Sequence, residues 1–345
     1  MDVMVLLLLT GGLFLGWSLG ANDAANVFGT AVGTRMVSFT KAAMICSVFV
    51  ILGAVISGAG TSNTLGKLGA IDTLSASFVA AIAAALTVYV MTHLGLPVST
   101  SQAIVGAIVG WNLHSGSPTD VSVLIKIVGT WIACPILAGL VAMILYKVTV
   151  PSLRLARLHL LHLDALTRLA LIIAGAFGAY SLGANNIANV MGVFVAANPL
   201  EALDVGRLFS LSGIQQLFLL GGLAIALGVF TYSKKVMLTV GADLMPLSPV
   251  AAWIVVMSHS IVLFLFASQG LEALLARSGL PTIPLVPVSS TQAVVGAMLG
   301  LAILKGGGGI NFGVLVRIAS GWVTTPFIAL VICFASLSVL RNFFE

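Results

Sequence analysis

Apolar stretches of about twenty residues recur along the whole chain, and they limit the folds that it can adopt. A helix needs roughly 20 mostly apolar residues to cross a bilayer. Only 7% of the 345 residues are charged, whereas soluble domains carry about 25%. Backbone groups in lipid must be hydrogen-bonded internally, and these runs are too long for barrel strands. The sequence therefore predicts one all-α polytopic membrane domain without a soluble appendage, with the lipid bilayer as its main solvent.

Two kinds of apolar segment are predicted. Long spans are expected near residues 3–20, 40–60, 74–94, 121–148, 168–183, 207–231, 249–269 and 311–340. Shorter pieces lie near 24–34, 99–112, 187–197 and 289–304, each after a Gly-Ala-Asn or a Pro-Val-Ser break. In transporters, interrupted segments at matching places in two halves point to the binding site.

Three motif pairs show that the chain contains a duplicated unit. SLGANDAANVFG at 18–29 and SLGANNIANVMG at 181–192 agree at nine of twelve positions. PVSTSQAIVGAIVG at 97–110 and PVSSTQAVVGAMLG at 287–300 agree at nine of fourteen. The third pair consists of Lys126, Trp131 and Pro135 in the first copy and of Arg317, Trp322 and Pro326 in the second.

The duplication predicts an inverted-repeat helical bundle with broken helices and re-entrant hairpins. Its parts are a first repeat at 1–150, a basic linker at 151–164 and a second repeat at 165–345. Counting spans does not separate inverted from parallel repeats, but discontinuous helices are more common in inverted ones. The linker is either a helix along the membrane surface or a solvated loop. The net charge of +5 comes from sparse residues near span ends, as in membrane proteins, and does not indicate nucleic acid.

The two Ser/Thr-Gln pieces are candidates for an anion site. Each follows Pro-Val and fits a capping box, so each is expected to begin a helix. A helix start offers free N–H groups and a partial positive charge, which suit an anion. A plain cap needs one hydroxyl and each copy offers three, so we favour a site for a tetrahedral oxyanion over simple capping. The residues are Ser99, Thr100, Ser101, Gln102, Ser289, Ser290, Thr291 and Gln292.

The two Gly-Ala-Asn pieces are candidates for a cation site. Asp23 is the one acidic residue within the predicted apolar segments, and an ionisable group inside a membrane indicates function. Small neighbours predict that the backbone unwinds there, so that carbonyl, amide and carboxylate oxygens could hold sodium. The alternative for Asp23 is a structural group bonded to backbone amides. The candidates are Asn22, Asp23, Asn26, Asn185, Asn186 and Asn189.

Electrostatics favours a cation beside the anion. A buried carboxylate repels an oxyanion, and a bound cation would remove that repulsion. A dianion entering an inside-negative cell works against about 4.6 kcal/mol at 100 mV, so two or more cations would have to accompany it.

Lys126 and Arg317 either border an anion path or extend to the membrane interface. His259 is either a packed core residue or a proton carrier.

With these motifs the sequence resembles the inorganic phosphate transporter (PiT) family. GANDAANVFGTAVGTR at 20–35 is similar to the family signature, the paired PVSxxQ pieces match its hairpin motifs, and the resemblance covers nearly the whole chain. It implies a multi-pass protein of the cell membrane, often a homodimer, that imports phosphate with sodium or protons and uses no other cofactor. By position, the Ser/Thr-Gln residues take the phosphate role, and Asn22, Asp23, Asn185 and Asn186 take the cation role.

One position departs from the family pattern. The family usually has Asp in both repeats, and the second repeat here has Asn186. This difference puts the number of coupled cations in question, and some relatives with altered signatures carry sulfate. A sulfate permease is therefore the alternative reading. We consider two other classes and expect neither: a serine hydrolase using His259, for which nothing in the sequence fixes a Ser–His pair, and a passive anion channel, which the carboxylate of Asp23 would hinder.

Overall fold

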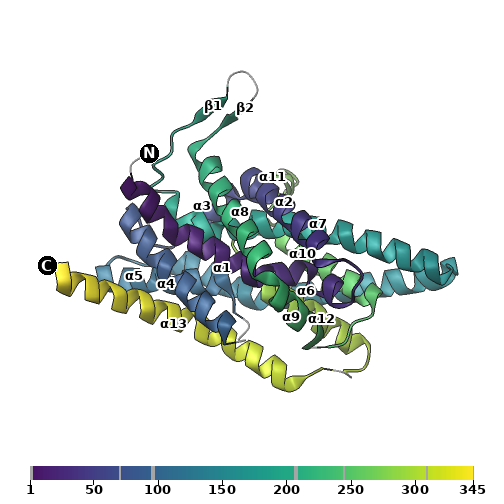
Figure 1. Cartoon of the computed structure of the whole chain (residues 1–345). Helices are drawn as coiled ribbons and strands as arrows, with labels where there is room; N and C mark the ends of the chain where they lie inside the picture. The colour runs from purple at the N-terminus through teal and green to yellow at the C-terminus, as the bar shows by residue number, and fades with distance from the viewer. Residues whose placement is uncertain are drawn as a thin grey trace.

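The computed structural model describes residues 3–69, 71–94, 98–205, 209–243, 245–307 and 310–344. In these ranges the chain forms α1 (Val3–Gly33), α2 (Phe39–Ser57), α3 (Ala59–Gly66), α4 (Leu74–His93), α5 (Thr100–Ser115), α6 (Val121–Ala156), α7 (Leu160–Met191), a short 3-10 helix (Gly192–Phe194), β1 (Leu203–Val205), β2 (Phe209–Leu211), α8 (Gly213–Thr231), α9 (Ser233–Asp243), α10 (Pro249–Leu265), α11 (Gln269–Arg277), α12 (Ser290–Leu304) and α13 (Phe312–Phe344). Figure 1 shows a bundle of helices with one small hairpin.

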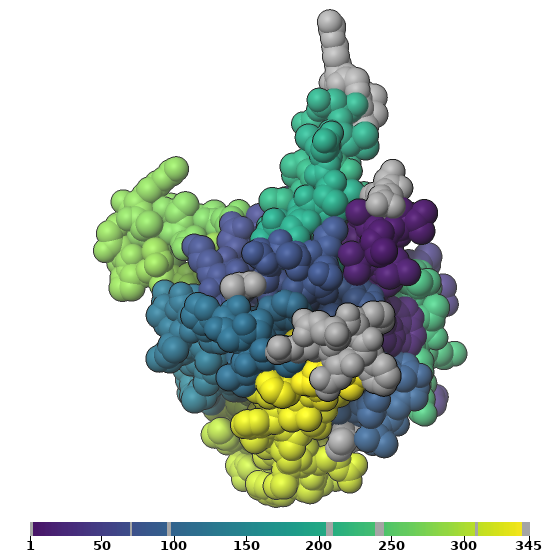
Figure 2. Space-filling model, turned by 90° about the vertical axis from the view of Figure 1, so that its left-hand side faces the viewer, coloured from purple at the N-terminus to yellow at the C-terminus, as the bar shows by residue number. Residues whose placement is uncertain are grey.

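The predicted all-α polytopic membrane architecture is confirmed. Seven helices of the described chain are long and apolar enough to cross a membrane, or eight if α10 and α11, which meet at 64°, form one span. Two parts project from the helical body. The antiparallel β1–β2 hairpin extends away from it (Figures 1 and 2). The span predicted near 207–231 begins only at Gly213 in α8, and Phe209–Leu211 form β2 instead. The light-green α11 segment forms a second projection (Figure 2) and buries none of its residues.

Equivalent helices of the two repeats make reciprocal contacts. Helix α1 packs on α8 while α7 packs on α2, and α5 packs on α13 while α12 packs on α6. The helices approach closely at matched glycines, where a Cβ added to Gly106 would collide with the Pro326 carbonyl and one added to Gly296 with the Pro135 carbonyl. Reciprocal contacts of this kind are those of a two-fold relation. The two repeats are thus interlocked rather than merely adjacent.

The starts of α5 and α12 meet head to head. Ser101 Oγ donates to the Val288 carbonyl just before α12, at 2.9 Å. Thr291 Oγ1 donates to the Val98 carbonyl just before α5, at 3.2 Å. Figure 1 places the two helices on opposite sides of the centre. Equivalent helices that begin at one point and lead away in opposite directions are expected of inverted repeats.

The predicted unwinding at the Gly-Ala-Asn pieces is wrong. Helix α1 continues from Val3 to Gly33 and α7 from Leu160 to Met191, so each motif lies inside a regular helix. The glycines serve helix packing instead, because a Cβ on Gly20 would collide with the Ile225 carbonyl of α8. Any site at these pieces would therefore be formed by their polar side chains and not by exposed backbone carbonyls.

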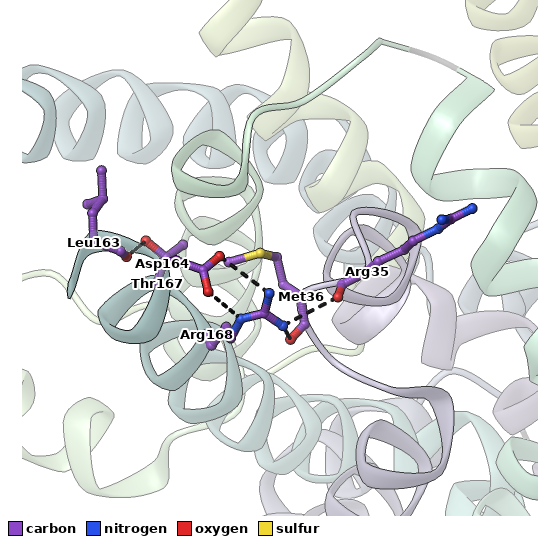
Figure 3. Close-up of polar contacts among 6 residues, drawn as sticks. All are labelled: Arg35, Met36, Leu163, Asp164, Thr167 and Arg168. Atoms are coloured by element: carbon purple, nitrogen blue, oxygen red, sulfur yellow. Dashed lines mark hydrogen bonds and ion pairs between the residues drawn. The ribbon is translucent and has the colours of Figure 1, made fainter. Parts of the chain in front are cut away.

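The segment predicted as a basic linker is mostly helical. Its first part ends α6 at Ala156 and its last part begins α7 at Leu160. Arg168 joins the start of α7 to the segment that follows α1 (Figure 3). Its guanidinium donates to Asp164 at 2.7 Å and to the Met36 carbonyl at 2.9 Å. Both partners of the ion pair are nearly half exposed, so solvent screening leaves the pair itself little effect on stability.

Candidate functional site

All fourteen predicted site residues are buried, with at most 8% of any of them exposed. They come from four elements: the C-terminal half of α1, the last two turns of α7, and the starts of α5 and α12. Hydrogen bonds join α1 to α12 and α7 to α5, so each repeat contributes to both halves of the cluster. Polar groups in a lipid-embedded core are costly unless they are paired or serve a ligand. This concentration marks the candidate site.

Ser99 and Ser289 cap the two helices as predicted. Ser99 Oγ accepts from the backbone N–H of Gln102 at 3.4 Å, and Ser289 Oγ accepts from that of Gln292 at 3.3 Å. The glutamine side chains do not complete a capping box, because the Oε1 atoms of both are buried without a partner among the described residues. Both amides are therefore available to a ligand at the paired helix starts. Pro97, which opens the first motif, lies outside the described residues.

Ser101 and Thr291 hold the two hairpins together. Each donates its hydroxyl hydrogen to a backbone carbonyl of the opposite hairpin. Each also accepts from an asparagine, Ser101 from Asn189 at 2.8 Å and Thr291 from Asn26 at 3.3 Å. A hydroxyl has one hydrogen to donate, and here it is used within the protein. These two hydroxyls consequently have a structural role in this conformation.

Thr100 and Ser290 occupy matched positions but have different surroundings. Thr100 Oγ1 is buried without a partner among the described residues. Ser290 Oγ accepts from Asn26 at 3.1 Å and lies 2.8 Å from His259 Nε2. The anion-site candidates thus divide into two caps, two hydroxyls that join the hairpins, two further hydroxyls and two glutamines.

Asp23 and Asn186, which are matched positions of the two repeats, contact each other. Asp23 Oδ2 accepts from Asn186 Nδ2 at 3.3 Å, and Asp23 Oδ1 accepts from Asn22 Nδ2 at 2.8 Å. The contact lies where the pseudo-two-fold relation brings α1 and α7 together. Two neutral amides therefore surround the one carboxylate of the cluster.

The remaining asparagines differ in how fully their amides are used. Asn185 Oδ1 accepts from the Val288 N–H and its Nδ2 donates to the Val286 carbonyl, so it supports the segment before α12. The Oδ1 atoms of Asn186 and Asn189 are buried without a partner in the described part of the chain. Carboxylate and amide oxygens of this kind suit a small hard cation. Within that part there is no cluster of three His, Cys, Asp or Glu side chains.

Three other residues considered from the sequence can now be placed. Lys126 and Arg317 are exposed on α6 and α13 and are not part of the cluster. His259 is fully buried on α10 and contacts the cluster through Ser290. In the sequence, His259 stands out because it lies between two serines within an apolar run.

A comparison with protein families identifies the chain. The model of the phosphate transporter family matches residues 19–163, 159–273 and 279–345. The chain belongs to the phosphate transporter family. It is a multi-pass membrane protein, as the resemblance implied.

Individual relatives span most of the chain. It is 27% identical to "Putative phosphate permease MJ0630" of Methanocaldococcus jannaschii, over 96% of this chain and 97% of that protein. It is 30% identical to the sulfate permease CysP of Bacillus subtilis, over 95% of this chain and 85% of that protein. A solved structure described as the sodium-dependent phosphate transporter shares the fold, with a TM-score of 0.78 and 24% identity over 99% of this chain and 100% of that one.

Proposed function

We propose that this member of the phosphate transporter family imports inorganic phosphate by symport with sodium ions or protons. The observation that carries the proposal is the head-to-head meeting of α5 and α12 inside the bundle. Two helix starts direct their free N–H groups and partial positive charges at one buried point. Neither lysine nor arginine contributes to the cluster, so an anion there would be held by neutral donors.

The residues around that point can surround a tetrahedral anion. Backbone N–H groups of both helix starts, the hydroxyls of Thr100 and Ser290, and the amides of Gln102 and Gln292 supply donors from two opposite sides. Hydrogen phosphate also carries a proton of its own, for which the unpartnered Oε1 atoms of the glutamines are suitable acceptors. Ser99, Ser101, Ser289 and Thr291 would shape the site by capping the helices and joining the hairpins.

The coupled cation would bind beside Asp23. Asn186 offers an unpartnered amide oxygen there, and Asn22, Asn26 and Asn185 would hold the surrounding segments in place. Asn189, whose amide oxygen is also unpartnered, would support the start of α5 through Ser101. A proton on Asp23 is the other form that coupling could take. Because the cluster is closed from water, the two repeats would have to open alternately to either side of the membrane.

A sulfate permease is the second candidate function. The 30% identity to a sulfate permease favours it, as does Asn186, which leaves one carboxylate where the family usually has two. Sulfate has no proton at neutral pH and needs only donors. The two anions therefore differ in whether the glutamine Oε1 atoms are used.

Exposed apolar side chains on α6 indicate what would surround the transporter. Helix α6 exposes a continuous apolar row, Ile125, Val128, Ile132, Ile136, Leu140 and Ile144, which would face lipid or a second copy in a homodimer. We expect no enzymatic activity, since the polar cluster offers donors and oxygen ligands rather than an activated nucleophile.

Uptake into proteoliposomes tests the proposal. Radiolabelled phosphate would be offered with a sodium gradient alone, with a pH gradient alone, and with neither. We expect concentrative uptake under at least one gradient and no loss of uptake in excess sulfate. Uptake that ignores both gradients would support a channel instead, and strong competition by sulfate would support the second candidate.

A further inference from the structure

His259 makes the two halves of the anion site unequal. It lies on α10 with no exposed surface, and its Nε2 atom is 2.8 Å from Ser290 Oγ at the start of α12. The matched hydroxyl at the start of α5 belongs to Thr100, which has no partner among the described residues. One half of the site thus has a buried imidazole behind its hydroxyl and the other half does not.

Most of the hydrogen-bonding capacity of the Ser290 hydroxyl is used by partners within the protein. A hydroxyl has one hydrogen to donate and two lone pairs that accept. Asn26 Nδ2 carries only hydrogens and donates to Ser290 Oγ at 3.1 Å, which fills one lone pair. The role of the second lone pair depends on which nitrogen of His259 carries the proton.

The surroundings of the imidazole favour a proton on Nε2. The other nitrogen, Nδ1, is buried without a partner in the described part of the chain. Orphaned buried N–H groups are rarer than under-satisfied acceptors. A bare lone pair on Nδ1 is therefore preferred over an N–H, and the proton goes to Nε2, which donates to Ser290. Both lone pairs of Ser290 Oγ are then filled, so its hydrogen is free only for a further acceptor.

We propose that His259 is a positioning residue that makes Ser290 an obligate hydrogen-bond donor to the transported oxyanion. The inference rests on the proposed function and adds a residue outside the repeated motifs to the anion site. Thr100 on the other half keeps a hydroxyl that is free to rotate. The anion is therefore oriented mainly by the α12 half, and the pseudo-symmetric site holds it asymmetrically.

A double-mutant cycle separates this role from simple packing. The variants are His259→Phe, which keeps a ring and removes the donor, His259→Gln, which keeps an amide donor, Ser290→Ala, and the double variant His259→Phe/Ser290→Ala. Ser260→Ala is the matched control, because Ser260 is equally buried on α10 and bonds only to backbone carbonyls. The KM and the maximal rate of labelled phosphate uptake are measured for each.

We expect His259→Phe to raise the KM for phosphate about three- to tenfold, the usual value of one neutral hydrogen bond, with a smaller change in maximal rate. His259→Gln should restore most of the loss, and His259→Phe should add nothing in the Ser290→Ala background. An unchanged KM in His259→Phe, or an effect that persists without the Ser290 hydroxyl, would overturn the inference. Absence of saturable phosphate uptake by the unmodified protein and by Ser260→Ala would instead refute the proposed function.

A second measurement reads the protonated nitrogen in the unmodified protein and needs a variant only to assign the signal. The protein has five histidines, and selective 15N labelling of histidine reports the protonated nitrogen of each by NMR. The His259 signal is the one that His259→Gln removes. A proton on Nε2 supports the inference, and a neutral ring with its proton on Nδ1 overturns it.

Discussion

Replacing Asn186 by Asp should change how many charges move with each phosphate. In the present protein the Asn186 amide donates to Asp23 at 3.3 Å. Asn186→Asp keeps the shape of the side chain and exchanges that donor for a second carboxylate. Two unit charges at such a separation repel by about 5 kcal/mol at an effective dielectric constant near 20. One additional bound cation, either sodium or a proton, would remove the repulsion.

The extra cation has a measurable electrical consequence. One more positive charge per phosphate adds about 2.3 kcal/mol of driving force at 100 mV, inside negative. That energy corresponds to about fiftyfold more phosphate accumulated at equilibrium. The assay is labelled phosphate accumulation in proteoliposomes whose membrane potential is clamped with potassium and valinomycin at several values.

The matched control is the exchanged pair, Asp23→Asn with Asn186→Asp. It has one carboxylate, as the unmodified protein has, and moves it to the other repeat. We expect it to retain the voltage dependence of the unmodified protein, whereas Asn186→Asp alone becomes steeper by one charge. An unchanged voltage dependence in Asn186→Asp would refute the reasoning that the carboxylate count sets the coupling.

Three further predictions concern stability, each measured by thermal unfolding in one detergent. Gly296→Ala would place a Cβ against a carbonyl of α6 and should lower the free energy of unfolding by about 1–3 kcal/mol. Gly129→Ala is the control, because a Cβ there meets open space, and it should be neutral or slightly stabilising. Equal effects of the two substitutions would contradict the close packing of the hairpins. Ser101→Ala should cost about 1–3 kcal/mol because it leaves the facing carbonyl and an asparagine amide unpaired, and an unaltered midpoint would contradict its role between the hairpins. Arg168→Ala should lower the unfolding midpoint only slightly, with a smaller difference at high salt. A midpoint lowered as far as that of Ser101→Ala would contradict a screened surface contact.

The sequence was sufficient for features that depend on local pattern. Apolar runs predicted four of the eight long spans, near 40–60, 74–94, 249–269 and 311–340, to within a few residues, since hydropathy follows directly from the bilayer as solvent. The other four helices begin or end six or more residues from the predicted limits. The serine caps at Ser99 and Ser289 were predictable because a cap is set within four residues. Duplication predicted that the two helix starts act as a pair, which neither copy alone would have done, and the structure brings them together.

Other features depend on contacts between distant segments. The small residues beside Asn22 were interpreted as points of unwinding, but Gly20 instead allows α8 to approach α1 closely. The bond from Ser101 to the opposite hairpin joins residues 187 positions apart, so its structural use could not be separated from ligand binding in advance. The contact of His259 with Ser290 likewise required the packing of α10 on α12.

The most direct test of the anion site is an experimental structure of the protein with phosphate, repeated with arsenate as the heavier tetrahedral analogue. We predict density for one anion between the starts of α5 and α12, within hydrogen-bonding distance of Ser290, Gln102 and Gln292. An anion bound instead at Lys126 or Arg317, with the paired helix starts unchanged and empty at saturating phosphate, would contradict the proposed site.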